Sequence, residues 1–108
     1  MKVINAAEVW GGDGLKIKYD RRRISYKKNN YASAISVEFV LNPVTLLIYV
    51  DTLALWHPPH ENEQMSELDK SMIINSITRA LKLLKVKYEI VSSNSLTLQR
   101  ALRDEWRD

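Results

Sequence analysis

Apolar residues occupy every second position over two short stretches near the N-terminus. They are Leu15, Ile17 and Tyr19 in the first stretch, and Ile24 and Tyr26 in the second. A period of two places alternate side chains on one face, which is typical of a half-buried strand. Because a polar turn near residues 20–22 separates the two stretches, the pattern predicts a β-hairpin.

The segments on either side of this hairpin are less regular. Residues 1–10 are expected to hold an earlier strand, through either Val3 and Ile4 or Val9 and Trp10. The sequence GGDG at residues 11–14 predicts a turn after that strand, because glycine tolerates positive φ. The polar residues 27–34 are expected to form a loop.

Two further strands are predicted in the middle of the chain. Alternating apolar positions run from Ile35 to Leu41, and Pro43 is expected to end this strand because proline cannot donate to a β-ladder. Residues 45–50 (TLLIYV) are apolar at both sets of alternate positions. This run therefore predicts a central strand that is covered on both faces, on one of them by a helix.

The longest helix is predicted between Ser66 and Lys85. Ser66 is a good N-cap, and Asp69 three positions later can complete a capping box. Apolar residues then recur at helical spacing on one stripe. They are Ile73, Ile77, Ala80, Leu81 and Leu84.

The C-terminal part predicts a last strand at residues 86–91, a turn at 92–95 and a short helix at 96–106, where Leu98, Leu102 and Trp106 share one face. Consecutive strands at short spacing favour an antiparallel arrangement. The predicted fold is therefore α+β: an antiparallel β-meander of about five strands packed against one long helix, with a short C-terminal helix. Residues 1–108 are expected to form a single domain.

Composition narrows the class of protein. The chain has no cysteine, which excludes disulfides and cysteine chemistry, and its apolar runs are too short to span a membrane. We therefore expect a cytoplasmic protein. Its net charge of +3 is unevenly distributed, because residues 1–31 are rich in Lys and Arg whereas residues 51–69 contain five acidic residues and no basic ones. Separate positive and negative surfaces would steer a partner, although solvated charge alone also explains the pattern.

Candidate chemistry is weak. His57, His60 and Glu61 include metal-ligand types, but Pro58 and Pro59 prevent the helical spacing that would align them, and there is no third histidine. Ser66 could act as a nucleophile beside a histidine, but the sequence around it has neither a nucleophile-elbow pattern nor a phosphate-binding pattern. The sequence therefore predicts no enzyme, no metal and no cofactor.

Two binding surfaces remain open. The basic hairpin from Lys16 to Lys28, with tyrosines nearby, could bind nucleic acid, although Tyr19 and Tyr26 are in phase with the predicted core. The segment around Trp56 could instead bind a protein. Trp56 either caps the core or anchors a partner, and the neighbouring polar side chains are candidate contacts. The predicted partner-binding residues are Trp56, His57, His60, Glu61 and Glu63.

The region from Leu55 to Ile90 resembles the immunity protein 74 family of bacterial polymorphic-toxin systems, which include contact-dependent growth inhibition. Its sequence has a tryptophan and a double proline, then an acidic stretch, a capped helix and a final strand. The residues that carry the resemblance are Trp56, Pro58, Pro59, Glu61, Glu63, Ser66, Ile73, Ile74, Ile77 and the run Val86–Ile90. The preceding strand, Leu47 to Asp51, also suits that family.

The resemblance implies a small α+β immunity protein that binds and neutralises a cognate toxin domain by steric occlusion, without a cofactor. The alternative is a small nucleic-acid-binding regulator that uses the basic hairpin. If the toxin is a nuclease, we expect the acidic segment from Asp51 to Asp69 to face its active-site cleft, or the inhibitor to bind an exosite. A purely structural subunit is a third possibility, and it predicts constitutive oligomers with no separable partner.

Overall fold

The computed structural model describes residues 1–41 and 43–91, and within them it contains seven strands and one α-helix. The strands are β1 (Lys2–Asn5), β2 (Glu8–Trp10), β3 (Lys16–Tyr19), β4 (Arg23–Lys28), β5 (Tyr31–Val40), β6 (Thr45–Tyr49) and β7 (Tyr88–Val91). A short 3-10 helix at Val50–Thr52 follows β6, and α1 spans Glu67–Leu83. The α+β class and the long helix are confirmed, but there are more strands than the five predicted. The C-terminal helix predicted at residues 96–106 lies outside the described residues.

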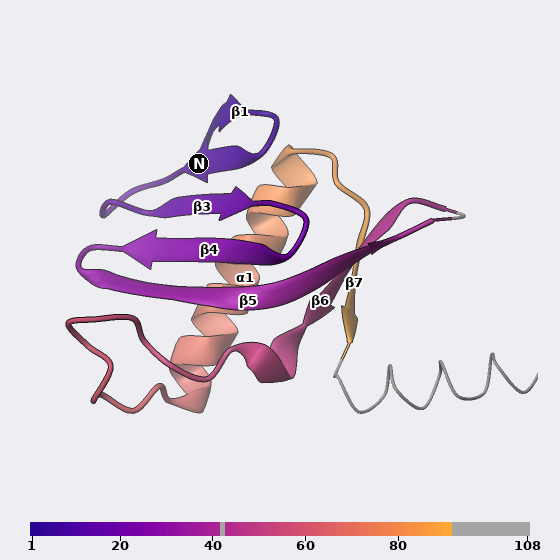
Figure 1. Cartoon of the computed structure of the whole chain (residues 1–108). Helices are drawn as coiled ribbons and strands as arrows, with labels where there is room; N and C mark the ends of the chain where they lie inside the picture. Colours follow the sequence, from indigo (N-terminus) through magenta and orange to yellow (C-terminus); the bar gives the residue numbers. More distant parts are fainter. Residues whose placement is uncertain (42, 92–108) are drawn as a thin grey trace, which may run out of the picture.

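All seven strands form one sheet in which neighbours in sequence are neighbours in space (Figure 1). The pairs from β1 to β6 are antiparallel, as the meander predicted. In contrast, β7 pairs parallel to β6. The purely antiparallel prediction was wrong here because α1 lies between these two strands in the chain, and such a crossover returns the chain in its original direction.

Strand β5 changes partner halfway along its length. Its first part pairs with β4, from Tyr31 to Ser36, whereas its last part pairs with β6, from Val37 to Val40. The predicted loop at residues 27–34 was wrong, because Lys28 pairs directly with Tyr31 across a tight turn. Asn29 adopts a positive φ of 55° in this turn, a conformation that asparagine tolerates better than most residues.

Both ends of α1 are closed by local hydrogen bonds. At the N-terminus the Asp69 N–H donates to Ser66 Oγ at 3.0 Å, and the Ser66 N–H donates to the Asp69 carboxylate at 2.9 Å, which confirms the capping box. At the C-terminus the Val86 N–H donates to the Leu81 carbonyl, and the Lys85 N–H donates to that of Lys82. This pattern is a Schellman motif, and it holds Lys85 at a positive φ of 58°.

Helix α1 covers one face of the sheet, and the main core lies between them (Figure 1). The helix contributes the predicted stripe, of which Ile73, Ile77, Ala80 and Leu81 are buried. The sheet contributes Val9, Ile17, Ile24, Tyr26, Ile35, Val37, Leu46 and Ile48. Residues 45–48 of β6 are all buried, which agrees with the predicted central strand. No described helix is long and apolar enough to cross a membrane.

Candidate partner-binding site

The residues that were predicted to bind a partner lie on a loop that runs beside β5. We call residues 53–65 the edge loop. The His57 N–H donates to the Ala32 carbonyl at 2.8 Å, and the buried Ser33 hydroxyl donates to the Leu55 carbonyl at 2.8 Å. These bonds occupy the edge of β5 that β6 leaves open, so the loop has a fixed position on the sheet.

Aromatic side chains hold the edge loop against the start of β5. Trp56 is buried, with 8% of its surface exposed, and its ring meets Tyr31 edge-on at a centroid distance of 5.0 Å. The His60 ring stacks on Tyr31 at 3.8 Å with an interplanar angle of 11°. Tyr31 is therefore packed by two residues of the loop, and this packing orients the loop side chains.

The Glu63 carboxylate ties the same cluster together. It accepts a hydrogen bond from the Tyr31 hydroxyl at 2.8 Å and also contacts His60 Nδ1. The Tyr31 hydroxyl and then His60 lower the pKa of Glu63, so this carboxylate keeps its charge at neutral pH. The same hydrogen bond raises the pKa of Tyr31, which keeps its proton. Glu63 therefore presents a fixed negative charge.

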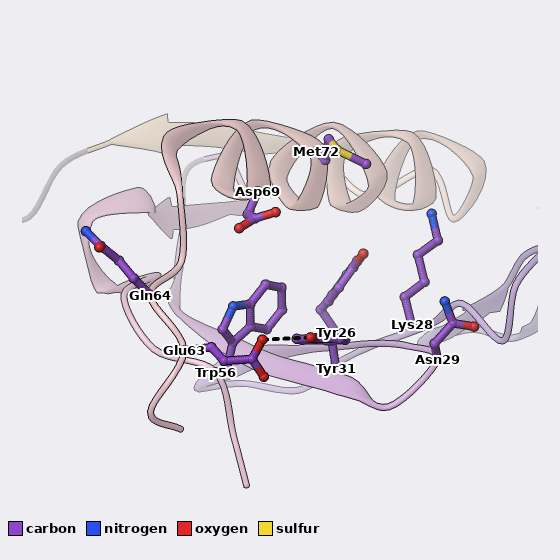
Figure 2. A pocket seen from close by; sticks show the side chains of 9 residues that line it. All are labelled: Tyr26, Lys28, Asn29, Tyr31, Trp56, Glu63, Gln64, Asp69 and Met72. Atoms are coloured by element: carbon purple, nitrogen blue, oxygen red, sulfur yellow. Dashed lines mark hydrogen bonds between the residues drawn. The ribbon is translucent and has the colours of Figure 1, made fainter. Parts of the chain in front are cut away.

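A pocket of about 270 Å³ opens beside this cluster, between the first turns of α1 and the β4–β5 turn (Figure 2). Its walls combine aromatic rings with charged and amide groups. The lining residues are Tyr26, Lys28, Asn29, Tyr31, Trp56, Glu63, Gln64, Asp69 and Met72. In Figure 2, Tyr26 points from the sheet toward the helix and Asp69 points from the helix toward the sheet.

Two hydrogen-bonding groups of this pocket are unused. Tyr26 and Trp56 are each more than nine-tenths buried, yet within the described part of the chain neither the Tyr26 hydroxyl nor the Trp56 indole N–H has a partner. Neither atom is sealed from solvent. Burial and then the charge of Asp69 raise the pKa of Tyr26, so its hydroxyl remains a donor. Buried polar groups normally find partners, and both side chains line a pocket that a ligand can enter.

The five predicted partner-binding residues do not all meet at this pocket. Trp56 and Glu63 line it, and His60 supports it through Tyr31. Glu61 is exposed on the edge loop, whereas His57 lines a separate hollow on the other side of the sheet. Because the two histidines diverge, they form no common centre, and no group of three potential metal ligands occurs in residues 1–41 and 43–91.

Sequence reasoning missed the part that β4, β5 and α1 play in the pocket. Tyr26 was assigned to the core, Asp69 to the helix cap and Tyr31 to a loop. These assignments were incomplete, because Tyr26 and Asp69 also face the pocket from opposite sides. A tyrosine in phase with core isoleucines was the available indication, since a buried hydroxyl needs a partner.

Comparisons with known proteins place the chain in a family. Residues 16–91, from β3 to β7, match the family described as immunity protein 74. No curated protein and no solved structure gives a significant match. Immunity proteins neutralise toxins and are not themselves enzymes, so the match confirms the predictions of a non-enzymatic protein and of a toxin as its partner. The matched region is longer than the region in which the resemblance was noticed, and the chain belongs to the immunity protein 74 family.

Proposed function

We propose that this protein neutralises its cognate toxin domain by docking the edge loop and the adjacent pocket onto it, which blocks the toxin sterically. The observation that carries this proposal is the pocket with two unused hydrogen-bonding groups, the Tyr26 hydroxyl and the Trp56 N–H. We place this action in the cytoplasm of the bacterium that makes the toxin.

The chemistry of the site favours a cationic side chain of the toxin. Two carboxylates, Glu63 and Asp69, line the pocket, whereas Lys28 is the one cation in its lining. Aromatic walls also suit a guanidinium or ammonium group, because the face of a ring attracts a cation. An arginine has five N–H groups that can donate to the Asp69 carboxylate and to the Tyr26 oxygen, whereas the Trp56 N–H needs an acceptor of the partner, such as a main-chain carbonyl. Glu61, which is exposed on the edge loop two residues before Glu63, adds a further negative charge to this loop.

A preformed site supports inhibition by occlusion. The edge loop is already fixed by its bonds to Ala32 and Ser33, so little conformational entropy is lost on binding. The position of Trp56 is compatible with both of its predicted roles, which are to cap the core and to anchor a partner. Its ring packs in the core and also lines the pocket, where a buried aromatic residue can anchor a partner.

The test uses the cognate toxin domain. The two proteins are expected to purify together, and the complex is expected to lack toxin activity. Glu61→Lys and Glu63→Lys, made separately, are each expected to weaken binding about tenfold or more, because they put a positive charge where a cationic group docks. Binding is measured by calorimetry, and protection is measured by growth in cells that express the toxin domain.

Glu89→Lys is the matched control. Glu89 is also an exposed carboxylate, but it lies on β7, so the same change of charge is expected to leave toxin affinity intact. Equal affinity for the wild type and both loop variants would contradict docking through the edge loop. Release of toxin activity in a stable complex would contradict occlusion.

A further inference from the structure

The second surface of interest is the face of the sheet that α1 does not cover. In β2 to β5, residues that alternate with the core positions point away from the helix. We call this surface the bare face. Its register brings Trp10, Lys16, Lys27 and Ala32 into one row across four strands. The neighbouring row is Glu8, Lys18, Ser25 and Ala34. No other described helix or strand lies over these rows (Figure 1).

The cations around the depression of the bare face outnumber its carboxylates. None of Lys16, Lys18, Arg23 and Lys27 forms an ion pair with a carboxylate in residues 1–41 and 43–91. Glu8, which lies next to Lys18 in register, instead accepts a hydrogen bond from the Trp10 N–H at 2.5 Å. The bare face therefore carries an excess of positive charge.

One pair on this face works against the stability of the sheet. Lys16 and Lys27 are directly opposite each other on β3 and β4. Like charges at such positions destabilise a sheet. The exposed positions of a strand can be filled by neutral side chains or by charges of both signs. Solubility alone therefore does not require two lysines opposite each other.

The bare face is also hollow. A depression of about 460 Å³ is lined by four cations and one carboxylate, together with neutral or small side chains. The lining residues are Lys16, Lys18, Arg23, Lys27, Glu8, Ser25, Tyr26, Ala32, Ser33 and His57. Trp10 stands at the end of the row that contains Lys16 and Lys27. It is 42% exposed, and Lys16 Nζ lies 4.9 Å from the centroid of its ring. An exposed tryptophan beside a basic depression is a composition typical of binding surfaces.

We propose that the bare face is a second docking surface, which binds an acidic surface of a partner protein. This inference rests on the proposed function in one respect, since it takes the toxin as the protein that carries the acidic surface. Charge complementarity supports it: unpaired cations around a hollow attract carboxylates and steer their approach. The protein then holds its toxin by two surfaces of opposite charge, the edge loop and the bare face.

A protein partner fits this face better than nucleic acid does. Single-stranded nucleic acid is usually bound by aromatic side chains on which bases stack. Tyr19 and Tyr26 point to the helix-covered face and pack in or against the core, as their phase with Ile17 and Ile24 predicted. Trp10 is the one aromatic residue of the two rows, and its ring is already in contact with Lys16.

The test compares two double variants that remove equal charge. Lys16→Gln with Lys27→Gln changes the bare face, whereas Arg79→Gln with Lys82→Gln changes exposed positions of α1. Association rates with the toxin domain are measured at low and high salt. The bare-face variant is expected to associate about tenfold more slowly at low salt, with a difference that shrinks as salt screens the charges. The α1 variant is expected to stay within about twofold of the wild type, because α1 lies on the opposite side of the sheet from the bare face.

Three further probes separate the possible outcomes: poly-L-glutamate, a single-stranded RNA and a DNA duplex. Binding of poly-L-glutamate that is lost only in the bare-face variant supports the inference even if the toxin domain binds nowhere, which would overturn the proposed function alone. Identical behaviour of the two double variants toward toxin and poly-L-glutamate overturns the inference and leaves the edge loop untouched. Tight, salt-sensitive binding of RNA or DNA through the bare face, without binding of either acidic probe, overturns it in favour of a nucleic-acid partner.

Discussion

The two faces of the sheet are made by the same strands and have opposite properties. In β3 and β4, Ile17, Ile24 and Tyr26 are at most 6% exposed, whereas Lys16, Ser25 and Lys27, which alternate with them, are exposed. The difference arises because α1 covers only one face. The net charge of +3 for the whole chain therefore conceals a locally strong positive surface, and its position follows from strand register rather than from composition.

This contrast assigns different consequences to substitutions on the two faces. A change on the covered face alters packing, so it is expected to affect the free energy of unfolding. A change on the bare face alters charge in solvent, so it is expected to affect partner binding with little effect on folding.

Ile77→Asp is expected to unfold the protein. Ile77 is 1% exposed on the core stripe of α1, and a carboxylate there would lose its hydration without gaining a partner. The cost is expected to exceed about 4 kcal/mol, which is most of the stability of a typical domain. Circular dichroism and thermal unfolding measure the effect. Arg22→Glu, an equally drastic change at an exposed turn, serves as the control and is expected to fold; a folded Ile77→Asp protein would show that the covered face is not the main core.

Lys27→Glu is expected to stabilise the protein slightly. It replaces the Lys16–Lys27 repulsion by an attractive cross-strand pair, which contributes about 0.2–1 kcal/mol. Chemical denaturation measures the gain, and salt is expected to reduce it. The same variant is expected to bind the toxin domain more slowly. A gain in stability without slower binding would show that the Lys16–Lys27 pair affects folding but does not contribute to toxin binding.

Tyr31→Phe is expected to change one titration with little change in folding. The Tyr31 hydroxyl is the main cause of the lowered pKa of Glu63, so its removal should raise that pKa toward the ordinary value of 4.5. Because the folded-state pKa is lowered, the contact stabilises the edge loop above pH 4.5, and this contribution is lost as the pH falls through the lowered value. An NMR pH titration of the Glu63 carboxyl carbon measures the shift. An unchanged titration would assign the lowered pKa to His60 instead.

The parts of the fold that could be predicted are those in which local pattern and tertiary packing agree. The stripe of α1, its Ser66 cap and the strands around Ile17 and Ile24 follow from periodicity that burial preserves. The start of β5 could not be found in this way. Its residues are mixed because half of them face the bare surface, and its pairing depends on a turn at Asn29 whose positive φ leaves only a weak trace in the sequence.

The candidate site could be predicted only on its loop side. Trp56 and Glu63 stood out because a tryptophan and acidic residues follow a predicted strand without a structural pattern of their own. The opposite wall of the pocket comes from β4 and α1. There, Tyr26 was already explained as a core residue and Asp69 as part of the helix cap. Which of these side chains face one another depends on how the helix packs on the sheet, and single-sequence periodicity does not contain that information.

The change of partner along β5 has a consequence for how such an antidote can diverge. The edge loop is attached to that strand by main-chain groups, by the Ser33 hydroxyl and by the contacts of Trp56, His60 and Glu63 with Tyr31, and none of these attachments uses the side chain of His57 or Glu61. Exposed residues such as His57 and Glu61 can therefore be exchanged one at a time without altering the attachment. A lineage can follow a changing toxin through single substitutions, each tried on an intact scaffold, much as antibodies vary the loops of a constant framework.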